Sequence, residues 1–443
     1  MKTNTRKPFL PLFFGLMCSL VYSQVQLPKT PVASGFKDYT SEHGMPKSSV
    51  PNTSFQIPRS NGLAIYEQDR LRVEQQEEAL KQVYADFNAG RINFALPSYS
   101  NIESTKHYRN AFDKLLELNP NEFSIKKATF IIENAFFEEE KEDAEFDAII
   151  EQSGDFIREK MKELDFDQNS NLAKNFMLFK FFSDTLQIKS KNLKHLPLKY
   201  DFEDYMGIKD WSKMFVSKLL STGKGQCNSL PRLYLILAEE IGAEAYLSLS
   251  PNHSYIKFRD EDGNWYNVEL TNGMFTTDSM ILQSGFIKSE ALQKGIYMQQ
   301  LTSKQLFSQL LTDFGGGYTR KYGYDAFVKK VIDKALELNP NSISANMFNA
   351  DFLTEQFEYA AKQVGVNIRN RTDLQNIRFY PEIVQLLNRT KAQYSKVDDL
   401  GFEFMSPEAY QKWLASLLDT EQQESNKDLQ AQFNQTLNQT FKD

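Results

Sequence analysis

The chain has 443 residues, of which 41% are hydrophobic and 25% charged, a composition typical of a globular protein with room for two or three domains. Acidic residues outnumber basic ones by 58 to 51, and the basic residues are scattered along the sequence. Because nucleic acid is bound by a clustered positive face, this balance argues against nucleic acid as a partner.

Residues 1–23 have the pattern of a secretory signal peptide. Basic residues stand near the start, the apolar run "PFLPLFFGLMCSLVY" follows, and Val21 and Ser23 occupy the two selective positions of a cleavage site before Gln24. The apolar run is shorter than a comfortable membrane span requires. We therefore expect an exported protein, periplasmic or secreted, that keeps no membrane span after signal removal. An uncleaved membrane anchor is the alternative.

The chain has two cysteines, Cys18 and Cys227. Cys18 lies in the predicted signal peptide, and Met17 stands before it where a lipidation site requires a small residue, so we do not expect lipidation. Removal of the signal leaves Cys227 as a single thiol, in a compartment where cysteines usually form disulfides. A buried, inert cysteine and a reactive thiol are both open interpretations of this residue.

Composition and periodicity divide the remaining chain into segments. Residues 24–60 contain five prolines among Ser, Thr and Lys. They bury too little apolar surface to offset their ordering entropy, which predicts a disordered linker. Apolar residues at helical spacing dominate the sequence that follows. The predicted segments are a helical region at 61–118, a mixed domain at 119–300, a helical hairpin at 301–365, and C-terminal helices with a polar tail at 366–443.

Two helix endings in the sequence are similar. "FDKLLELNPN" begins at Phe112 and "IDKALELNPN" begins at Ile332, and in both the proline stops the helix. The pattern is similar to the helix ends of tetratricopeptide repeats, but the copies lie too far apart for one uninterrupted array. We expect the second copy to belong to a tetratricopeptide-like hairpin and the first to be an ordinary helix end.

The sequence predicts no cofactor and no metal site. The glycine run in "DFGGGYTRKYG" (313–323) lacks the preceding strand and the lysine-serine ending of a phosphate-binding loop, so we expect a turn between helices. Stripes of Met and Phe at helical spacing are expected in the core. The histidines are too scattered to form a ligand cluster with a single cysteine: His43, His107, His195 and His253.

The stretch "GQCNSLPRLYLILAEEIG" predicts a buried helix that begins just after Cys227. Pro231 is tolerated only in the first turn of a helix, and Gly242 suits a C-terminal cap. The unpaired amides and the dipole at a helix start favour a thiolate over a thiol. Cys227 therefore has an activating position, and its backbone amide, aided by the Gln226 side chain, is a candidate oxyanion hole.

Strands are predicted after this helix, and "RDEDGN" joins two of them in a hairpin. A two-residue loop at Asp262-Gly263 would place His253 and Glu269 on opposite faces of the sheet. A three-residue loop with Gly263 in the left-handed conformation pairs Tyr255 with Glu269. It also leaves His253 diagonal to Glu269, within reach of a side-chain hydrogen bond. Both loop lengths are compatible with the sequence.

The motifs "G-x-C-N-S-L-x-x-L-Y-x-x-L-A-x-x-I-G-A", "P-N-H" and "G-N-W-Y-N-V-E" resemble the transglutaminase-like superfamily, in particular its SirB-type bacterial branch. The resemblance covers roughly residues 120–345. It implies a papain-like core, in which a helix carrying the nucleophile packs on a small antiparallel sheet. It also implies that Cys227, His253 and Glu269 form a catalytic triad, with Trp265 in support. Glu269 stands where the superfamily usually has Asp.

The sequence thus predicts a predominantly helical α+β protein with two possible functions. One is a cysteine acyl-transfer enzyme acting on an amide of a protein or peptide, by hydrolysis, deamidation or transamidation. The other is a catalytically idle scaffold of the cell envelope that binds a partner protein. Neither function requires a cofactor, and neither specifies an oligomeric state.

Overall fold

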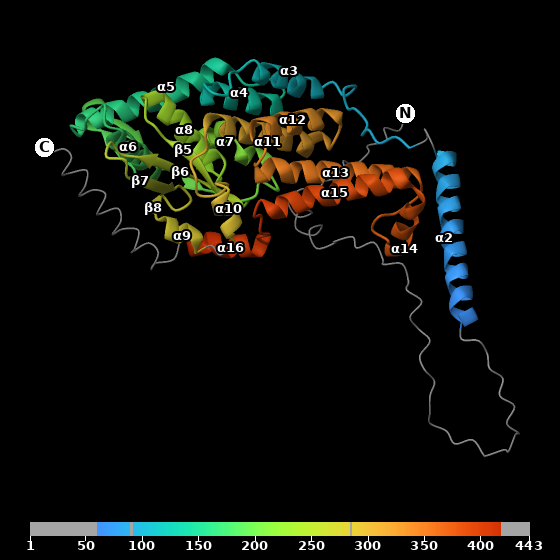
Figure 1. Cartoon of the computed structure of the whole chain (residues 1–443). Coiled ribbons are helices and arrows are strands. Elements are labelled where there is room, and N and C mark those ends of the chain that lie inside the picture. Colours follow the sequence, from blue (N-terminus) through green and yellow to red (C-terminus); the bar gives the residue numbers. More distant parts are fainter. Residues whose placement is uncertain (1–59, 89–91, 284–285, 418–443) are drawn as a thin grey trace, which may run out of the picture. The chain divides into compact units, whose positions relative to one another are not determined.

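The computed structural model describes residues 60–88, 92–283 and 286–417 (Figure 1). The predicted signal peptide, nearly all of the predicted linker and the predicted polar tail lie outside the described residues. Within these ranges the protein is predominantly helical with small sheets, which confirms the predicted α+β class at this level.

The described chain divides into two compact units. The larger unit contains residues 96–353 and 390–417 and all strands of the described chain. The smaller unit contains residues 60–95 and 354–389 and is helical. The larger unit thus combines the segment predicted as a mixed domain with helices from both neighbouring segments.

The smaller unit contains α2 (Ser60–Asn88) and the short 3-10 helix η3 (Gln375–Phe379). Tyr84 of α2 packs against Phe379 and Tyr380, with ring centroids 5.3 and 6.0 Å apart. Aromatic contacts of this kind hold the two helices together within the unit.

The larger unit contains an antiparallel four-stranded sheet whose strands follow in chain order. Side chains from β6, β7 and β8 are buried in one hydrophobic cluster with two helices, α6 (Asn171–Ser183) and α8 (Ser229–Ile241). Burial of this apolar surface positions α8, the helix that follows Cys227, against the sheet. The strands are β5 (Tyr246–Ser250), β6 (His253–Arg259), β7 (Trp265–Glu269) and β8 (Met274–Thr276).

The hairpin between β6 and β7 has the three-residue loop, and not the two-residue alternative. The register pairs Arg259 with Trp265, and Gly263 has a φ of +89°. One step beyond the last pair of this register puts Tyr255 across from Glu269, as the longer loop predicts. The loop length therefore decides which side chains meet at the far end of the hairpin.

Helices make up the rest of the larger unit, with short strand and 3-10 segments before α8 (Figure 1). Two helices, α13 (Ile343–Gln363) and α15 (Pro381–Asp399), have residues in both units. The other helices of the larger unit are α3 (Thr105–Leu116), α4 (Ile125–Phe136), α5 (Asp143–Glu163), α7 (Val216–Thr222), α9 (Asp278–Leu282), α10 (Ser289–Gln293), α11 (Ser303–Tyr322), α12 (Ala326–Leu338) and α16 (Pro407–Ser416). The short elements are β1 (Leu186–Ile188), η1 (Lys189–Lys191), β2 (Leu193–His195), β3 (Lys199–Tyr200), η2 (Trp211–Met214) and β4 (Lys224–Gly225), with α14 (Arg371–Leu374) in the smaller unit.

The helices α11 and α12 pack against each other as a hairpin. A capping box of Thr302 and Gln305 begins α11, and the Asp325 carboxylate begins α12 by accepting the amide of Phe327 at 2.9 Å. The second helix ends at Leu338, directly before the Asn-Pro pair, as the helix-end pattern predicts.

The predicted turn at the glycine run is wrong, because these glycines lie inside α11. A Cβ atom on Gly315 would come within 2.5 Å of the Phe348 ring, and one on Gly317 within 2.9 Å of the Tyr108 hydroxyl oxygen. Here glycine permits neighbouring aromatic side chains to pack against the helix backbone, which offsets its poor helix propensity.

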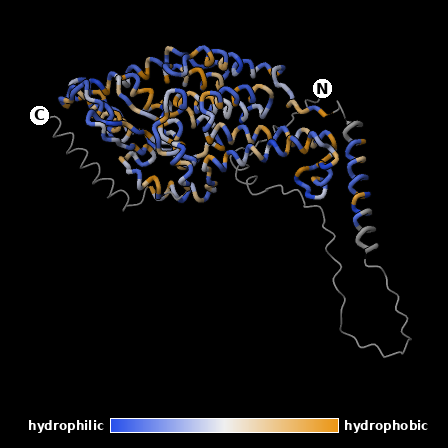
Figure 2. Tube along the Cα trace, viewed as in Figure 1, coloured by the Kyte–Doolittle hydropathy of each residue, from blue (hydrophilic) through white to orange (hydrophobic). Residues whose placement is uncertain are grey.

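Polar and apolar residues alternate along the helices, as the colouring in Figure 2 shows. Consistent with this pattern, no helix in the described part of the chain combines the length and apolar character needed to cross a membrane.

Candidate active site

Cys227 lies at the start of α8. The carbonyl of Gln226 accepts the amide of Leu230 at 3.0 Å, and the Gln226 amide donates to the Ser229 hydroxyl at 2.8 Å. These two bonds close the first helical turn from Gln226, so Cys227 is the first residue inside that turn. Cys227 therefore lies next to the N-terminus of α8, at the positive end of the helix dipole.

A proline links the Cys227 backbone to the sheet. In a regular helix the carbonyl of Cys227 would accept the amide of residue 231, but Pro231 has no N–H group. The hydroxyl of Ser254, on β6, donates to the Cys227 carbonyl instead. This bond connects Cys227 to the strand position directly after His253.

We expect Ser254→Ala to lower the free energy of unfolding by about 1–3 kcal/mol, because it leaves the Cys227 carbonyl without a donor. It should also slow alkylation of Cys227 several-fold by loosening the link to His253. Urea unfolding and labelling with iodoacetamide measure the two effects. Adding Pro231→Ala restores a helical N–H donor, so the double variant should recover stability. Independent, additive losses in the double variant would contradict this assignment.

His253 is the first residue of β6 and directly follows a tight turn. Ser250 pairs with His253 across the turn, and Asn252 has a φ of +57°. Pro251 presets φ at the preceding position, which together with a left-handed Asn252 is typical of a type II turn. The Asn252 side chain also donates to the carbonyl of Met405 at 3.3 Å.

The His253 ring is hydrogen-bonded to Glu269 within the protein interior. Nε2 of His253 lies 2.7 Å from Oε2 of Glu269, and the amide of Thr271 donates to Oε1 at 2.8 Å. The two side chains are only 1% and 6% exposed. The longer side chain of glutamate thus reaches the imidazole from the diagonal position.

The charge state of the pair follows from its surroundings. Burial alone would lower the pKa of His253, but the Glu269 carboxylate, together with hydrogen bonds to Cys227 and Glu269, raises this pKa to about 10. Burial alone would raise the pKa of Glu269, but the His253 imidazolium and the Thr271 amide hold it below its usual value. At neutral pH the pair is therefore an imidazolium bonded to a carboxylate.

The C-terminal helix α16 contributes two aromatic side chains to the same site. The hydroxyl of Tyr410 donates to Cys227 Sγ at 3.6 Å and lies 3.4 Å from His253 Nδ1. The ring of Trp413 meets the His253 ring edge-on, with centroids 4.7 Å apart. Burial raises the pKa of Tyr410, and electrostatic interaction with Cys227 and Tyr200 raises it further, which keeps its hydroxyl a donor at neutral pH.

The sequence analysis did not assign Tyr410 and Trp413 to the site. The available signal was "SPEAYQKWL", a Ser-Pro helix start followed by two aromatic residues three positions apart on one helix face. That pattern predicts a helix with an aromatic face, but it does not indicate what the face covers.

Gln226 does not have the geometry expected of an oxyanion donor. Its side chain is buried, and Nε2 donates to the carbonyls of Asp204 at 2.6 Å and Asp201 at 3.4 Å. The side-chain amide is therefore already engaged by the preceding loop. This leaves the backbone amide of Cys227 as the predicted donor whose position at the helix start suits an oxyanion.

Trp265 lies away from the other predicted site residues, at the loop end of the β6–β7 hairpin. The residue is 43% exposed, and its side chain contacts Tyr246 and Lys257. The structure therefore brings together Cys227, His253 and Glu269, but not Trp265.

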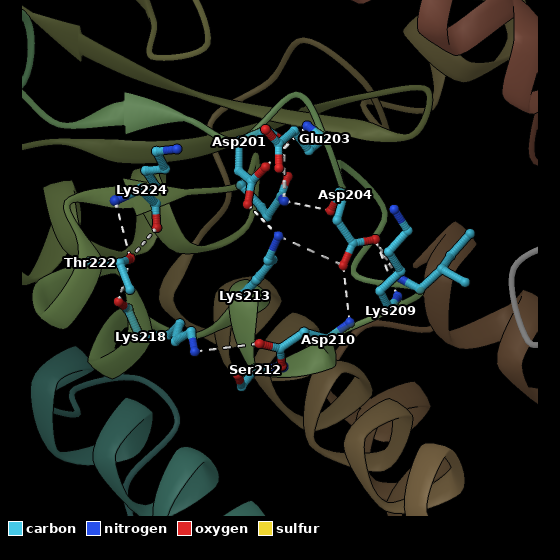
Figure 3. Close-up of polar contacts among 12 residues, drawn as sticks. Asp201, Glu203, Asp204, Lys209, Asp210, Ser212, Lys213, Lys218, Thr222 and Lys224 are labelled. Carbon is cyan, nitrogen blue, oxygen red and sulfur yellow. Dashed lines mark hydrogen bonds and ion pairs between the residues drawn. The ribbon is translucent and has the colours of Figure 1, made fainter.

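A polar cluster fixes the loop that receives Gln226 (Figure 3). The Asp204 carboxylate accepts the amides of Ile208, Lys209 and Asp210 at 2.9, 3.2 and 3.0 Å. Figure 3 shows the Lys213 side chain pointing toward two carboxylates, and Nζ lies 2.6 Å from Asp201 and 4.0 Å from Asp204. The cluster is thus a structural support for the turn before α8.

A cavity of about 360 Å³ opens beside the Cys227–His253 pair. Besides these two residues, its lining includes Tyr410, the polar side chains of Asn228 and Arg232, and apolar residues from β5 and α13. A cavity of this size holds a small part of a peptide next to the thiol.

The described residues contain no group of His, Cys, Asp and Glu side chains that could hold a metal ion. His107 pairs with Glu139 at 3.0 Å, and the ring of His195 stacks on Phe181 with centroids 3.6 Å apart. Comparison of the chain with known protein families, curated proteins and solved structures finds no match.

Proposed function

We propose that this protein is a cysteine acyl-transfer enzyme that acts on an amide of a protein or peptide, with Cys227 as nucleophile. The observation that carries the proposal is the 2.7 Å bond that anchors His253 to Glu269 while Tyr410 contacts both His253 and Cys227. The residue order and the packing of α8 on an antiparallel sheet support a papain-like arrangement of the transglutaminase-like kind. The predicted signal peptide supports export as the location of this activity.

In the first step, the Cys227 thiolate attacks the amide carbonyl carbon and a C–S bond forms. The backbone amide at the start of α8 donates to the oxygen that becomes negative. The His253 imidazolium then gives its proton to the leaving nitrogen as the C–N bond breaks, and a thioester remains on Cys227.

In the second step, neutral His253 takes a proton from water or from an amine as that nucleophile attacks the thioester. The C–S bond breaks, the thiolate leaves, and the imidazolium is restored. Water yields hydrolysis or deamidation, and an amine yields transamidation. Glu269 keeps Nε2 occupied throughout, so that Nδ1 remains directed toward the thiol.

Activity is tested with glutamine-containing peptides, by following ammonia release, amine incorporation and peptide cleavage by mass spectrometry. We expect the purified protein to catalyse one of these reactions and Cys227→Ser to lose at least about 99% of the rate. Trp265→Phe is the matched control and should retain the rate, because Trp265 lies at the exposed end of the hairpin. Equal rates for the wild type and Cys227→Ser would refute the proposal that Cys227 is the nucleophile of an enzyme.

The enclosure of the site favours a second candidate, an inactive scaffold. Tyr410 is only 1% exposed and contacts both Cys227 and His253. If α16 never moves, substrate access to the thiol is restricted, and the arrangement of Cys227, His253 and Glu269 would serve only packing. Under this alternative, Cys227→Ser preserves every partner interaction and every cellular phenotype in a folded protein.

A further inference from the structure

The cavity beside Cys227 has an excess of positive charge. Apart from Cys227 and His253, three cationic side chains line it, Arg232, Lys294 and Arg320, against one carboxylate, Asp313. The whole chain, in contrast, has a net charge of −7. A cationic cavity in an acidic protein favours an anionic ligand.

Arg232 is the buried cation of this cavity. Its side chain is only 7% exposed, and Nη2 is paired with the Asp313 carboxylate. Within the described chain Nε and Nη1 make no hydrogen bond, although both atoms retain some accessible surface. A guanidinium this deeply buried normally fills its donors, so its open side is suited to an acceptor supplied by a ligand.

The neighbouring carboxylate, Asp313, has no comparable open acceptor for a cationic ligand. Asp313 already accepts Asn228 Nδ2 at 3.2 Å and Gln309 Nε2 at 2.9 Å, in addition to Arg232. Glu133 is close enough to interact electrostatically with Arg232, but its oxygens accept the amides that begin α7, and it does not line the cavity. The cluster thus has unfilled donors on Arg232 and filled acceptors on Asp313.

The helix sets the spacing between the cation and the nucleophile. Arg232 lies in the first turns of α8 and Cys227 in the turn just before this helix, five positions earlier, which corresponds to about 7.5 Å along the helix axis. An extended peptide advances roughly 3.3 Å per residue. A carboxylate about two residues from the attacked carbonyl would therefore reach the guanidinium.

We propose that the cavity binds the carboxylate of a short anionic peptide through Arg232, and so selects substrates with a negative charge about two residues from the scissile amide. This proposal rests on the proposed role of Cys227 as nucleophile. The carboxylate is the shared chemistry of two sources, the C-terminus of a peptide and an acidic side chain. Glycine peptides and an aspartate peptide distinguish them.

The test uses chloroacetyl peptides, which alkylate Cys227 when the thiolate displaces chloride and an S–C bond forms. Chloroacetyl probes with one, two and four glycines are compared as free acids and as C-terminal amides. Chloroacetyl-Gly-Asp amide is the probe whose carboxylate belongs to an acidic side chain. In the wild type we expect the two-glycine acid to react about tenfold faster than its amide, with a smaller ratio at four glycines. Equal rates for every acid and amide pair would overturn the proposal.

Arg232→Gln should bring the acid-to-amide ratio close to one. Because that change leaves the half-buried Asp313 carboxylate without its cation, the double variant Arg232→Gln with Asp313→Asn tests the same point without an uncompensated charge. Arg259→Gln is the matched control, because Arg259 is exposed, pairs with Glu244 and does not line the cavity. A ratio that stays high in both Arg232 variants would assign the preference to another cation.

Labelling with uncharged iodoacetamide separates this proposal from the proposed function. Fast labelling that depends on His253, combined with no acid preference, would refute only the carboxylate site. Slow labelling that is independent of His253 would refute the activated nucleophile, whatever the acid preference.

Discussion

At about pH 6, replacing His253 with alanine is expected to slow alkylation of Cys227 by iodoacetamide at least about tenfold. An ordinary thiol with a pKa near 8.5 is less than about 1% ionised at this pH, whereas an adjacent imidazolium favours the thiolate. A thiolate with a lower pKa is a weaker nucleophile, but its rate constant falls by only about 0.4–0.5 log units per pKa unit (the Brønsted coefficient). Below the thiol pKa, the accompanying gain in thiolate concentration is about one log unit per pKa unit, so this gain dominates.

The pH profile provides the sharper readout. The pKa of His253 is raised to about 10, so the imidazolium persists through the neutral range and is lost only as the pH rises toward that value. Because the proposed mechanism pairs this imidazolium with a Cys227 thiolate, it predicts wild-type labelling that varies little between about pH 6 and pH 9. In His253→Ala the rate should rise about tenfold per pH unit below the thiol pKa.

The matched control for this experiment is His107→Gln, which removes a histidine of the larger unit that lies outside the cavity. It should label like the wild type over the whole pH range. A wild-type profile that rises with pH like that of a free thiol would contradict the thiolate–imidazolium pair, as would an unchanged profile in His253→Ala.

Glu269→Gln is expected to lower the free energy of unfolding by about 3–5 kcal/mol near neutral pH, because it removes one partner of a buried ion pair. The other partner, His253, is fully enclosed and must then lose its proton or remain charged without a counterion. The same change should reduce alkylation of Cys227, because His253 loses the carboxylate that favours its imidazolium form.

The destabilisation should depend on pH in a definite direction. The pKa of Glu269 is lowered in the folded state, so its contribution to stability is present above the usual carboxyl pKa and is lost as the pH falls through the folded value. The pKa of His253 is raised, so its contribution is lost as the pH rises toward about 10. The difference between wild type and Glu269→Gln should therefore be largest between about pH 5 and pH 6.5, and should decline as the pH rises from there toward about 10.

Urea unfolding at several pH values measures this difference. Glu140→Gln is the charge-matched control and should change stability by less than about 0.5 kcal/mol, because Glu140 is exposed. A Glu269→Gln effect that is small, or that is constant across the pH range, would show that the two side chains are not an ion pair in solution.

Local chemistry explains why parts of the site could be predicted. The start of α8 was predictable because Pro231 and Gly242 restrict where a helix begins and ends. The β6–β7 loop was narrowed to two lengths, because Gly263 suits either geometry. Only the observed register selects the longer loop and places Glu269 within 2.7 Å of His253.

Other parts of the site depend on residues that are distant in sequence. Tyr410 follows Cys227 by more than 180 positions, yet its hydroxyl contacts the thiol. The glycines of α11 were predicted as a turn because their intrinsic preference disfavours helix, and the packing of Phe348 at Gly315 overrides that preference. Gln226 and Trp265 stood next to the predicted site in sequence, but hydrogen bonding and strand position direct them elsewhere.

By itself, the sequence determined the mostly helical class, a helix start just after Cys227, and the residue types from which the proposed nucleophile, base and acid are drawn. These features follow from periodicity, capping and turn preferences, which act over a few neighbouring residues. The tertiary structure alone decided the register of the β6–β7 hairpin, the packing of Tyr410 and Trp413 over the site, and the position of the Arg232 guanidinium in the cavity. Such features depend on burial and hydrogen bonds between distant segments, which no short stretch of sequence contains.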